Sequence, residues 1–198
     1  MGEGAALSRG DAGPPSRRSS LPGSPAARSS VLLAGCALAG LAATLLWPPP
    51  VLFVWNASAS APIGLYRVHG GDRIRRGDMV VAWAPPQARR LAANRHYLPA
   101  NVPLVKRIAA VGGDRVCAAG RSVTVNGRRA ASRRRLDPRG RPLPWWTGCR
   151  ILGSGDTFLL GSSPQSFDGR YFGITRRTAL VGRAVLLWAT AGKGSSHG

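Results

Sequence analysis

Two serines and one lysine are the side chains of this sequence whose types and settings suit nucleophilic chemistry. Ser58 and Ser60 lie two residues apart, just before Pro62 and Gly64. A serine hydroxyl is a weak nucleophile until a neighbouring base removes its proton. Lys106 is the candidate base, because a buried lysine can lose its proton whereas an arginine cannot.

The composition singles out this lysine. The chain has 198 residues and a formal net charge of +20, and only Lys106 and Lys193 among its 28 basic residues are lysines. Arginine supplies almost all of the positive charge, so a retained lysine suggests a task that arginine cannot perform. Lys193 lies in a Gly/Ser-rich tail, whereas Lys106 lies between apolar residues. Chance retention of one lysine is the competing explanation.

Lys106 is predicted to lie on a strand formed by residues 104–111. Side chains alternate along a strand, so Lys106 would share one face with Leu104, Ile108 and Ala110. Burial among apolar neighbours lowers the pKa of an amine, and a neutral amine can accept the proton of a serine hydroxyl. An exposed lysine at the edge of a sheet fits the same pattern, and the strand argument alone leaves both interpretations open.

Other chemistries fit the sequence less well. The chain has only eight acidic residues, so a paired-carboxylate glycosidase or an acidic metal cage is hard to build, and we predict neither a metal site nor a cofactor. A Ser/His/Asp triad would need His69 or His96, but neither lies in a catalytic motif and no Gly-x-Ser-x-Gly elbow occurs. The positive charge suits nucleic acid or anionic lipid, yet no zinc spacing or RNA-binding aromatic signature accompanies it. We therefore interpret it as an arginine-rich solvated surface and expect no nucleic-acid partner.

Composition divides the chain into four parts. Residues 1–30 are rich in Gly, Ala, Ser and Pro and are predicted to be disordered. Residues 31–47 form an uninterrupted apolar or small run, which predicts a single transmembrane anchor rather than a cleaved signal peptide. Residues 51–190 are predicted to form the catalytic domain, and residues 191–198 a flexible tail.

The orientation of the anchor follows from the flanking charges. Arg17, Arg18 and Arg28 precede the apolar run, and no charged residue follows until Arg67. Basic residues favour the cytoplasmic side of a membrane. The prediction is a bacterial inner-membrane protein with a cytoplasmic N-terminus and a periplasmic catalytic domain.

The domain after the anchor is predicted to be mainly β, because short apolar runs alternate with Gly, Pro and Asp. The predicted strands cover residues 65–69, 79–83, 104–111, 115–117, 122–125, 157–160 and 184–188, with a short helix over 87–98. Asn126 and Gly127 predict a tight hairpin turn. Cys117 and Cys149 fit a disulfide outside the cytoplasm and fit two buried thiols equally well.

Four motifs carry a resemblance to membrane signal peptidases. Residues 58–62 (Ser-Ala-Ser-Ala-Pro) resemble their serine box, and residues 105–114 resemble their lysine box, in which Lys-Arg is followed by Gly-Asp. The Val-Thr-Val-Asn-Gly of residues 123–127 and the Ser-Phe-Asp-Gly-Arg-Tyr of residues 166–171 follow in family order. Together the motifs cover nearly all of residues 55–188. The resemblance implies a signal peptidase-like β catalytic domain behind a single N-terminal transmembrane helix.

Within that family the motif sequences are most similar to those of the TraF-type conjugative-transfer maturation peptidases. General signal peptidases carry one more residue between the nucleophile and the proline, and a serine where this chain has Gly169. The resemblance implies a membrane-associated, pilin-like precursor as substrate and the lipid bilayer as a partner. It implies cleavage, or cyclisation if an amine resolves the acyl-enzyme.

The resemblance also assigns roles to individual residues. Ser60 matches the nucleophile and Lys106 the general base. Ser58 matches the hydroxyl that, with the backbone N–H of Ser60, holds the oxyanion. Ser166 matches the hydroxyl that orients the lysine, and two further residues match a brace of that loop or a plain structural ion pair: Asp168 and Arg170.

Three alternatives remain at this stage. The first is a general signal peptidase I that removes secretory signal peptides. The second is a non-enzymatic, membrane-anchored basic component of a transfer apparatus, which would bind nucleic acid or lipid. The third is a cytoplasmic self-cleaving repressor, which shares serine–lysine chemistry but does not explain the apolar run at residues 31–47.

Overall fold

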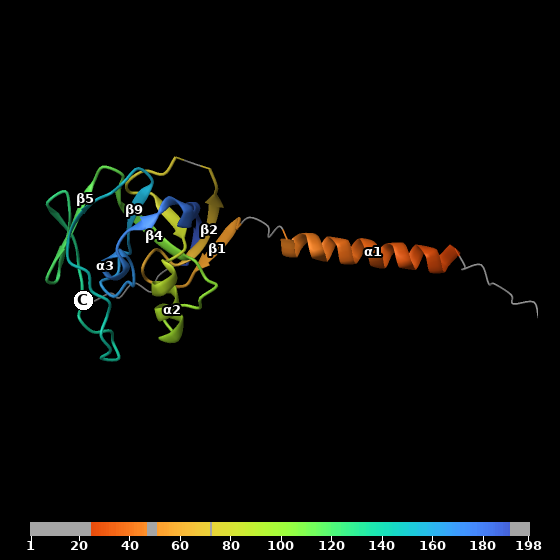
Figure 1. Cartoon of the computed structure of the whole chain (residues 1–198), viewed down its shortest axis with the longest axis horizontal. Helices are drawn as coiled ribbons and strands as arrows, with labels where there is room; N and C mark the ends of the chain where they lie inside the picture. Colours follow the sequence, from red (N-terminus) through yellow and green to blue (C-terminus); the bar gives the residue numbers. More distant parts are fainter. Residues whose placement is uncertain (1–24, 47–50, 72, 191–198) are drawn as a thin grey trace, which may run out of the picture. The chain divides into compact units, whose positions relative to one another are not determined.

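The computed structural model describes residues 25–46, 51–71 and 73–190, which fall into two compact units divided between residues 49 and 50 (Figure 1). Each unit is described by itself. The predicted tail at 191–198, most of the predicted disordered segment, and Trp47 at the end of the predicted anchor lie outside the described residues.

The described part of the first unit is a helix, α1 (Pro25–Leu46). It begins six residues before the predicted apolar run, so residues 25–30 are helical where disorder is predicted. Proline is accepted in the first turn of a helix because the backbone N–H it lacks has no partner there, and alanine favours helix. The large apolar side chains of α1 are exposed, as at Leu32 and Leu38. No helix among the described residues combines the length and the hydropathy of a membrane span.

The second unit, which we call the body, is mainly β, as predicted. Its elements are β1 (Phe53–Asn56), β2 (Gly64–His69), β3 (Met79–Ala82), α2 (Pro86–Asn94), β4 (Leu104–Val111), β5 (Arg115–Ala119), β6 (Ser122–Val125), β7 (Arg128–Ser132), β8 (Gly148–Ile151), β9 (Asp156–Leu160), α3 (Gly169–Phe172), β10 (Thr175–Arg176), a 3-10 turn (Arg177–Ala179) and β11 (Leu180–Ala189). The strands form a seven-stranded sheet in the order β1-β2-β11-β3-β4-β9-β10 and a four-stranded sheet in the order β7-β6-β5-β8. Every pairing of these described strands is antiparallel.

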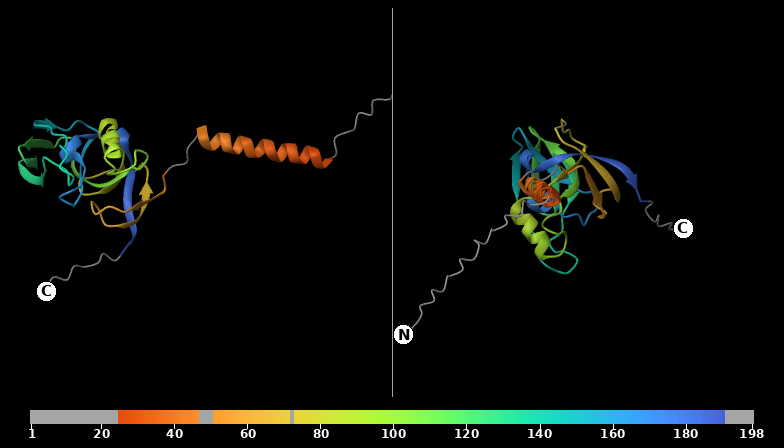
Figure 2. Two further views of the ribbon diagram at one scale, coloured as in Figure 1. Left: turned by 90° about the horizontal axis from the view of Figure 1, so that it is seen from below. Right: turned by 90° about the vertical axis from the view of Figure 1, so that its right-hand side faces the viewer.

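The first and last strands of the body lie on either side of β2. In Figure 2, β11 is the long blue strand beside β2. Ala189 of β11 pairs with Gly64 of β2, and Thr190 N–H donates to Ile63 O at 3.0 Å. Gly64 has no room for a side chain, because an added Cβ would lie inside contact distance of the Trp188 carbonyl. The end of β11 and Thr190 therefore close against the segment that leads into β2.

The interior between the sheets is packed with small and medium apolar side chains. One cluster joins Ala110 and Phe158 of the large sheet to Val116 and Val123 of the small sheet. A second cluster lies under the serine-bearing loop and includes Tyr66. Burial of apolar surface of this kind is the main source of stability in a small domain.

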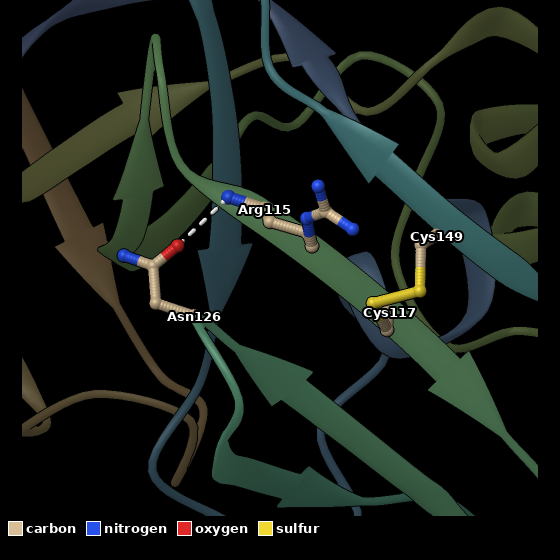
Figure 3. Close-up of a disulfide and its surroundings, with 4 residues drawn as sticks. All are labelled: Arg115, Cys117, Asn126 and Cys149. Atoms are coloured by element: carbon tan, nitrogen blue, oxygen red, sulfur yellow. Dashed lines mark hydrogen bonds between the residues drawn. A yellow bond between two sulfur atoms is a disulfide. The ribbon is translucent and has the colours of Figure 1, made fainter.

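The small sheet has a covalent link. Cys117 of β5 and Cys149 of β8 lie opposite one another on these neighbouring strands and form a disulfide (Figure 3). Beside it, Arg115 N–H donates to the side chain of Asn126 at 2.8 Å. Asn126 and Gly127 have φ values of 50° and 78°, as the tight turn between β6 and β7 requires.

The predicted strands all correspond to strands of the structure, and two have the predicted bounds: β4 and β6. The helix predicted over 87–98 is α2, which ends at Asn94, because the chain turns at His96 with a φ of 57°. Four strands are absent from the prediction: β1, β7, β8 and β10. β7 and β8 are exposed over most of their length and so carry no apolar alternation, and β10 has only two residues.

Candidate active site

The loop that carries Ser58 and Ser60 joins β1 to β2 and is built around Asn56. Asn56 is buried, and its side-chain nitrogen donates to the carbonyl oxygens of Ser58, Ala61 and Pro62 at 2.9, 3.1 and 3.0 Å. Its side-chain oxygen accepts from the N–H and the hydroxyl of Ser58 at 3.2 and 3.0 Å. One amide therefore fixes the course of the loop.

Ser60 and Lys106 meet inside the body. Lys106 lies on β4 opposite Val80 of β3, and only 4% of its surface is exposed, against 7% for Ser60. Lys106 Nζ donates to Ser60 Oγ at 2.5 Å. The neighbouring Arg107 is exposed, as the predicted alternation along the strand requires.

Ser58 extends this contact into a chain of hydrogen bonds. Its Oγ lies 2.7 Å from Ser60 Oγ and donates to the Asn56 side chain. Because Ser58 has one hydroxyl proton, Ser60 must donate to Ser58 in this arrangement while Lys106 donates to Ser60. The order Lys106, Ser60, Ser58, Asn56 is the resting arrangement expected when the amine is protonated.

The surroundings of Lys106 favour loss of its proton. Burial lowers the pKa of the amine to about 8, with a smaller opposing effect from the negative charge of Asp168 and a further lowering by Arg170. Near pH 8 the amine is therefore divided between its charged and neutral forms. An ordinary lysine side chain is almost wholly protonated at this pH.

Asp168 and Arg170 fix the backbone of the loop at Gly161, which lies against Ser60. They form a buried ion pair at 3.1 Å. The N–H of Gly161 donates to Asp168 Oδ2 at 2.7 Å, and Arg170 Nη2 donates to the carbonyl oxygen of Gly161 at 2.6 Å. Burial raises the pKa of Asp168, and the Arg170 charge opposes that rise. The pair contacts the loop rather than Ser60.

Gly161 is the point where this loop touches the serine. A Cβ at Gly161 would lie 2.8 Å from Ser60 Cβ and closer still to Ser166 Oγ. The next residue, Ser162, donates its N–H to the Ser60 carbonyl at 2.9 Å. Only glycine lets the two loops approach in this way.

Ser166 lies at the site without the predicted contact. Its hydroxyl is buried, and no hydrogen-bond partner for it occurs in the described part of the chain. The expected hydrogen bond from Ser166 to Lys106 is therefore not formed in this arrangement. Both residues nevertheless line one cleft, which has a volume of about 410 Å³ and opens beside Ser58 and Ser60.

The structure thus brings together all the residues that sequence analysis selected for the site. The predicted hydrogen bond from Ser166 to Lys106 is not formed. It also identifies Asn56 and Gly161, which sequence analysis missed. Asn56 gave a weak signal, since a polar residue follows the apolar run 51–55. Gly161 could have been noticed because it directly follows a predicted strand, where a glycine often indicates a close approach of two backbones. Within the described residues no histidine pairs with Ser60, whose hydroxyl has Lys106 and Ser58 as its hydrogen-bond partners.

A buried serine hydroxyl that contacts a lysine of lowered pKa, at the mouth of a peptide-sized cleft, meets the geometric requirements of nucleophilic acyl transfer. With the mainly β body around it, the site is typical of serine peptidases. The chain matches the family described as "Signal peptidase, peptidase S26" over residues 27–189, and it belongs to that family.

Similar proteins come from plasmid and conjugal transfer. The chain is 31% identical over 175 residues to a plasmid transfer protein TraF of Escherichia coli. The aligned region covers 81% of this chain and 91% of that protein. A second Escherichia coli protein of the same description is 32% identical over 79% of this chain and 96% of its own length. A conjugal transfer protein TraF of Agrobacterium fabrum is 32% identical over 65% of this chain and 78% of its own length.

Among solved structures, a signal peptidase I of Enterococcus faecalis matches 57% of this chain and 97% of its own, at 19% identity and a TM-score of 0.33.

Proposed function

We propose that this protein is a membrane-anchored serine endopeptidase in which Ser60 is the nucleophile and Lys106 the general base. The observation that carries the proposal is the 2.5 Å contact between Lys106 Nζ and Ser60 Oγ, both buried, with the pKa of the amine lowered to about 8. The substrate class is a precursor protein, and a pilin-like subunit of a transfer apparatus is the one we favour. The similarity to plasmid and conjugal transfer proteins supports that choice.

The reaction begins with the neutral amine. Lys106 accepts the Ser60 proton as Ser60 Oγ attacks a peptide carbonyl carbon, and the carbonyl oxygen takes up the negative charge. The N–H of Ser60 and the hydroxyl of Ser58 then stabilise that oxyanion. Because Ser58 has one proton, it must leave the Asn56 oxygen before it can donate to the oxyanion. The Ser166 hydroxyl has no hydrogen-bond partner within the described residues, so rotation of this side chain toward Lys106 would let it orient the neutral amine.

The second half restores the enzyme. The Lys106 ammonium gives its proton to the leaving amine, the peptide C–N bond breaks, and the acyl group remains on Ser60. Water then attacks the ester and gives a carboxylic acid, or a substrate amine attacks and gives a new amide. The first outcome is cleavage and the second is joining or cyclisation, and both return the proton to Ser60.

A membrane location is part of the proposal. The stretch 29–66 has no charged residue, and the apolar side chains of α1 are exposed. Within the body, β1 and the end of β11 expose a cluster of large apolar side chains: Phe53, Trp55, Leu186, Leu187 and Trp188. The rings of Trp55 and Trp188 lie 5.8 Å apart. Tryptophan favours the interface between lipid and water, so we assign this cluster to the bilayer surface, with the N-terminus in the cytoplasm and the body in the periplasm.

The test uses the full chain in proteoliposomes with a tagged pilin-like precursor of a conjugative transfer system. The wild-type enzyme should process the precursor and Ser60→Ala should not, although it folds. Ser154→Ala, which changes an exposed serine of the β8–β9 connection, is the matched control and should remain active. Processing that persists in Ser60→Ala refutes the proposed nucleophile.

A general signal peptidase role is the second candidate, because the family match is to signal peptidases. It predicts cleavage of ordinary secretory precursors with an efficiency similar to that of the pilin-like precursor. Under the first candidate only the pilin-like precursor is processed. A non-enzymatic basic module predicts instead salt-dependent DNA binding that is unchanged in Ser60→Ala and no processing of either precursor.

A further inference from the structure

The cleft beside Ser60 has an uneven distribution of charge. Its lining contains an apolar part, with side chains such as Leu104 and Phe167, and a wall rich in arginine. The charged side chains of the lining apart from Lys106 are Arg89, Arg95, Arg134, Arg139, Arg141 and Asp137. The wall therefore has five cations and one anion at neutral pH.

The anion, Asp137, already accepts hydrogen bonds at both carboxylate oxygens and is not free to pair with the remaining arginines. Only 2% of the Asp137 side chain is exposed. Oδ1 accepts from the backbone N–H groups of Arg139 and Arg141, and Oδ2 accepts from Arg141 Nε at 2.7 Å and from the Tyr97 hydroxyl. Arg95 Nη1 lies 3.8 Å from Oδ2. Burial alone would raise the pKa of Asp137, but these hydrogen bonds hold it below the ordinary value, so the carboxylate stays charged.

The same contacts hold a short hairpin, residues 134–143, over the cleft. Leu136 and Pro142 pair across it, and Arg95 Nη1 donates to the Pro142 carbonyl at 2.7 Å, which ties the hairpin to the chain after α2. Asp137 thus joins the two walls of the cleft. The backbone positions of the hairpin arginines are fixed before any substrate arrives.

Two of these arginines have neither an ionic nor an aromatic partner within the described residues, whereas Arg89 lies over the ring of Trp83. Arg134 and Arg139 are exposed, and their side chains make no ion pair or hydrogen bond within the described residues. Their backbones are anchored, because Arg134 N–H donates to the Tyr171 hydroxyl at 3.1 Å and Arg139 N–H to Asp137. A guanidinium can bind a carboxylate through two parallel hydrogen bonds, and with the backbone already anchored only the side chain loses conformational freedom on binding.

We propose that Arg134 and Arg139 form a subsite for an acidic side chain of the peptide substrate, within a few residues of the bond that Ser60 attacks. The inference rests on the proposed function and adds a specificity determinant to it. The apolar part of the cleft takes small or apolar substrate side chains, and the arginine wall takes Asp or Glu.

The experiment measures binding apart from cleavage. Full-length Ser60→Ala protein in detergent is titrated with fluorescent alanine-rich peptides in which one Glu, Gln or Lys is moved through the positions around the central Ala-Ala bond. At one position or more, Glu should bind about fivefold more tightly than Gln at moderate salt. The double variant Arg134→Ser/Arg139→Ser should lose that preference, and Arg134→Glu/Arg139→Glu should prefer Lys.

The control is a double variant on the small sheet. Arg121→Ser/Arg128→Ser removes two exposed arginines that do not line the cleft, and it should keep the Glu preference. Equal loss in both double variants would show a general effect of surface charge and overturn the subsite. A single-stranded oligonucleotide of matched charge that binds more tightly than the Glu peptide through Arg134 and Arg139 would also overturn it.

Cleavage by the wild-type enzyme separates this inference from the proposed function. Peptides that are cut but bind equally with Glu or Gln at every position leave the peptidase in place and remove the subsite. A Glu preference that follows Arg134 and Arg139, without cleavage of any peptide or precursor, supports the subsite and removes the peptidase.

Discussion

In the large sheet the amine of Lys106 lies among small apolar side chains on the central strands. In the small sheet a disulfide and a buried guanidinium support the two exposed outer strands, β7 and β8. Around Lys106 the neighbours on β3 are Val80 and Val81, both fully buried. The small sheet relies on the Cys117–Cys149 disulfide and on Arg133, which is wholly buried.

Arg133 shows how the small sheet uses an arginine where the large sheet uses a lysine. Its guanidinium donates to the carbonyl oxygens of Gly120 and Trp146 and lies 4.0 Å from the ring centre of Trp145. Arginine stays charged in such a place and its planar group suits stacking and several acceptors. A buried lysine gives up its proton more readily, so the two sheets separate a structural cation from a titratable amine.

Exchanging lysine for arginine tests this difference between the two sheets most directly. Lys106→Arg keeps the positive charge but removes the base, so kcat/KM for precursor processing should fall by about four orders of magnitude. Arg107→Lys on the exposed face of the same strand is the matched control and should change little. Processing by Lys106→Arg at near wild-type rate would rule out the general base.

Removal of the second hydroxyl should have the next largest effect. Ser58→Ala takes away one oxyanion donor while Ser60 and Lys106 remain, so kcat should fall by about 10²–10³-fold. Single-turnover cleavage of the precursor measures the chemical step. A complete loss of activity would instead indicate that the roles of Ser58 and Ser60 are exchanged.

Gly161→Ala tests the close approach of the two loops. The added methyl group must displace Ser60 or Ser166, and a misplacement of about 1 Å can cost about a hundredfold in kcat. The thermal unfolding midpoint of the variant reports the accompanying strain. Gly140→Ala in the hairpin, where a Cβ meets no atom within 4 Å, is the control for contact at glycine, although its φ of 74° adds strain of its own.

The pH dependence of kcat/KM tests the same difference, because a lysine that loses its proton produces it and a permanently charged arginine does not. Since the pKa of Lys106 is lowered to about 8, kcat/KM should fall about tenfold for each pH unit below 8 and level off above it. Asp168→Asn removes a charge that raises this pKa, so the acidic limb should move to lower pH. Selective ¹⁵N labelling of lysine gives the amine pKa directly. A limb that stays near 8 while the measured amine pKa moves would contradict the assignment.

The smallest effect on turnover is expected from the small sheet. Cys117→Ser/Cys149→Ser opens a link between residues 32 apart in sequence, which should lower the free energy of unfolding by about 3–4 kcal/mol. Activity below the unfolding temperature should change less than twofold, because neither cysteine contacts the site. Chemical denaturation of the full chain measures the first quantity, and a parallel loss of kcat would show that the sheets are not independent.

The sequence predicted those parts of the molecule that have a one-dimensional signal. The apolar run of residues 104–111 predicted the strand and placed Lys106 on one face with Ile108 and Ala110, all of which are buried in the structure. The strand pattern alone left an inward and an exposed Lys106 equally open, and the resemblance to the lysine box decided between them. The tight turn at Asn126 and Gly127 followed from residue type. β8 has no such signal because all four of its residues are exposed, and it is held by the disulfide and by pairing with β5.

The remaining parts of the site depend on contacts between segments far apart in the chain. The role of Gly161 exists only because the 161–166 loop meets residue 60, and the closure of the cleft at Asp137 needs Tyr97 and Arg95 from the other side. Ser166 was selected correctly as a neighbour of the site, but its missing hydrogen bond depends on rotamers that residue type does not determine.

The position of β11 has a consequence for the life of the protein before it is complete. The serine-bearing segment leads into β2, whose other neighbour is β11, the last of the described strands to be synthesised. Until those residues emerge, β2 lacks its inner partner and Ile63 lacks the backbone donor of Thr190. A chain that stops short of residue 180 therefore lacks the inner neighbour of β2, and we expect its serine-bearing loop to be held less firmly than in the chain that has β11.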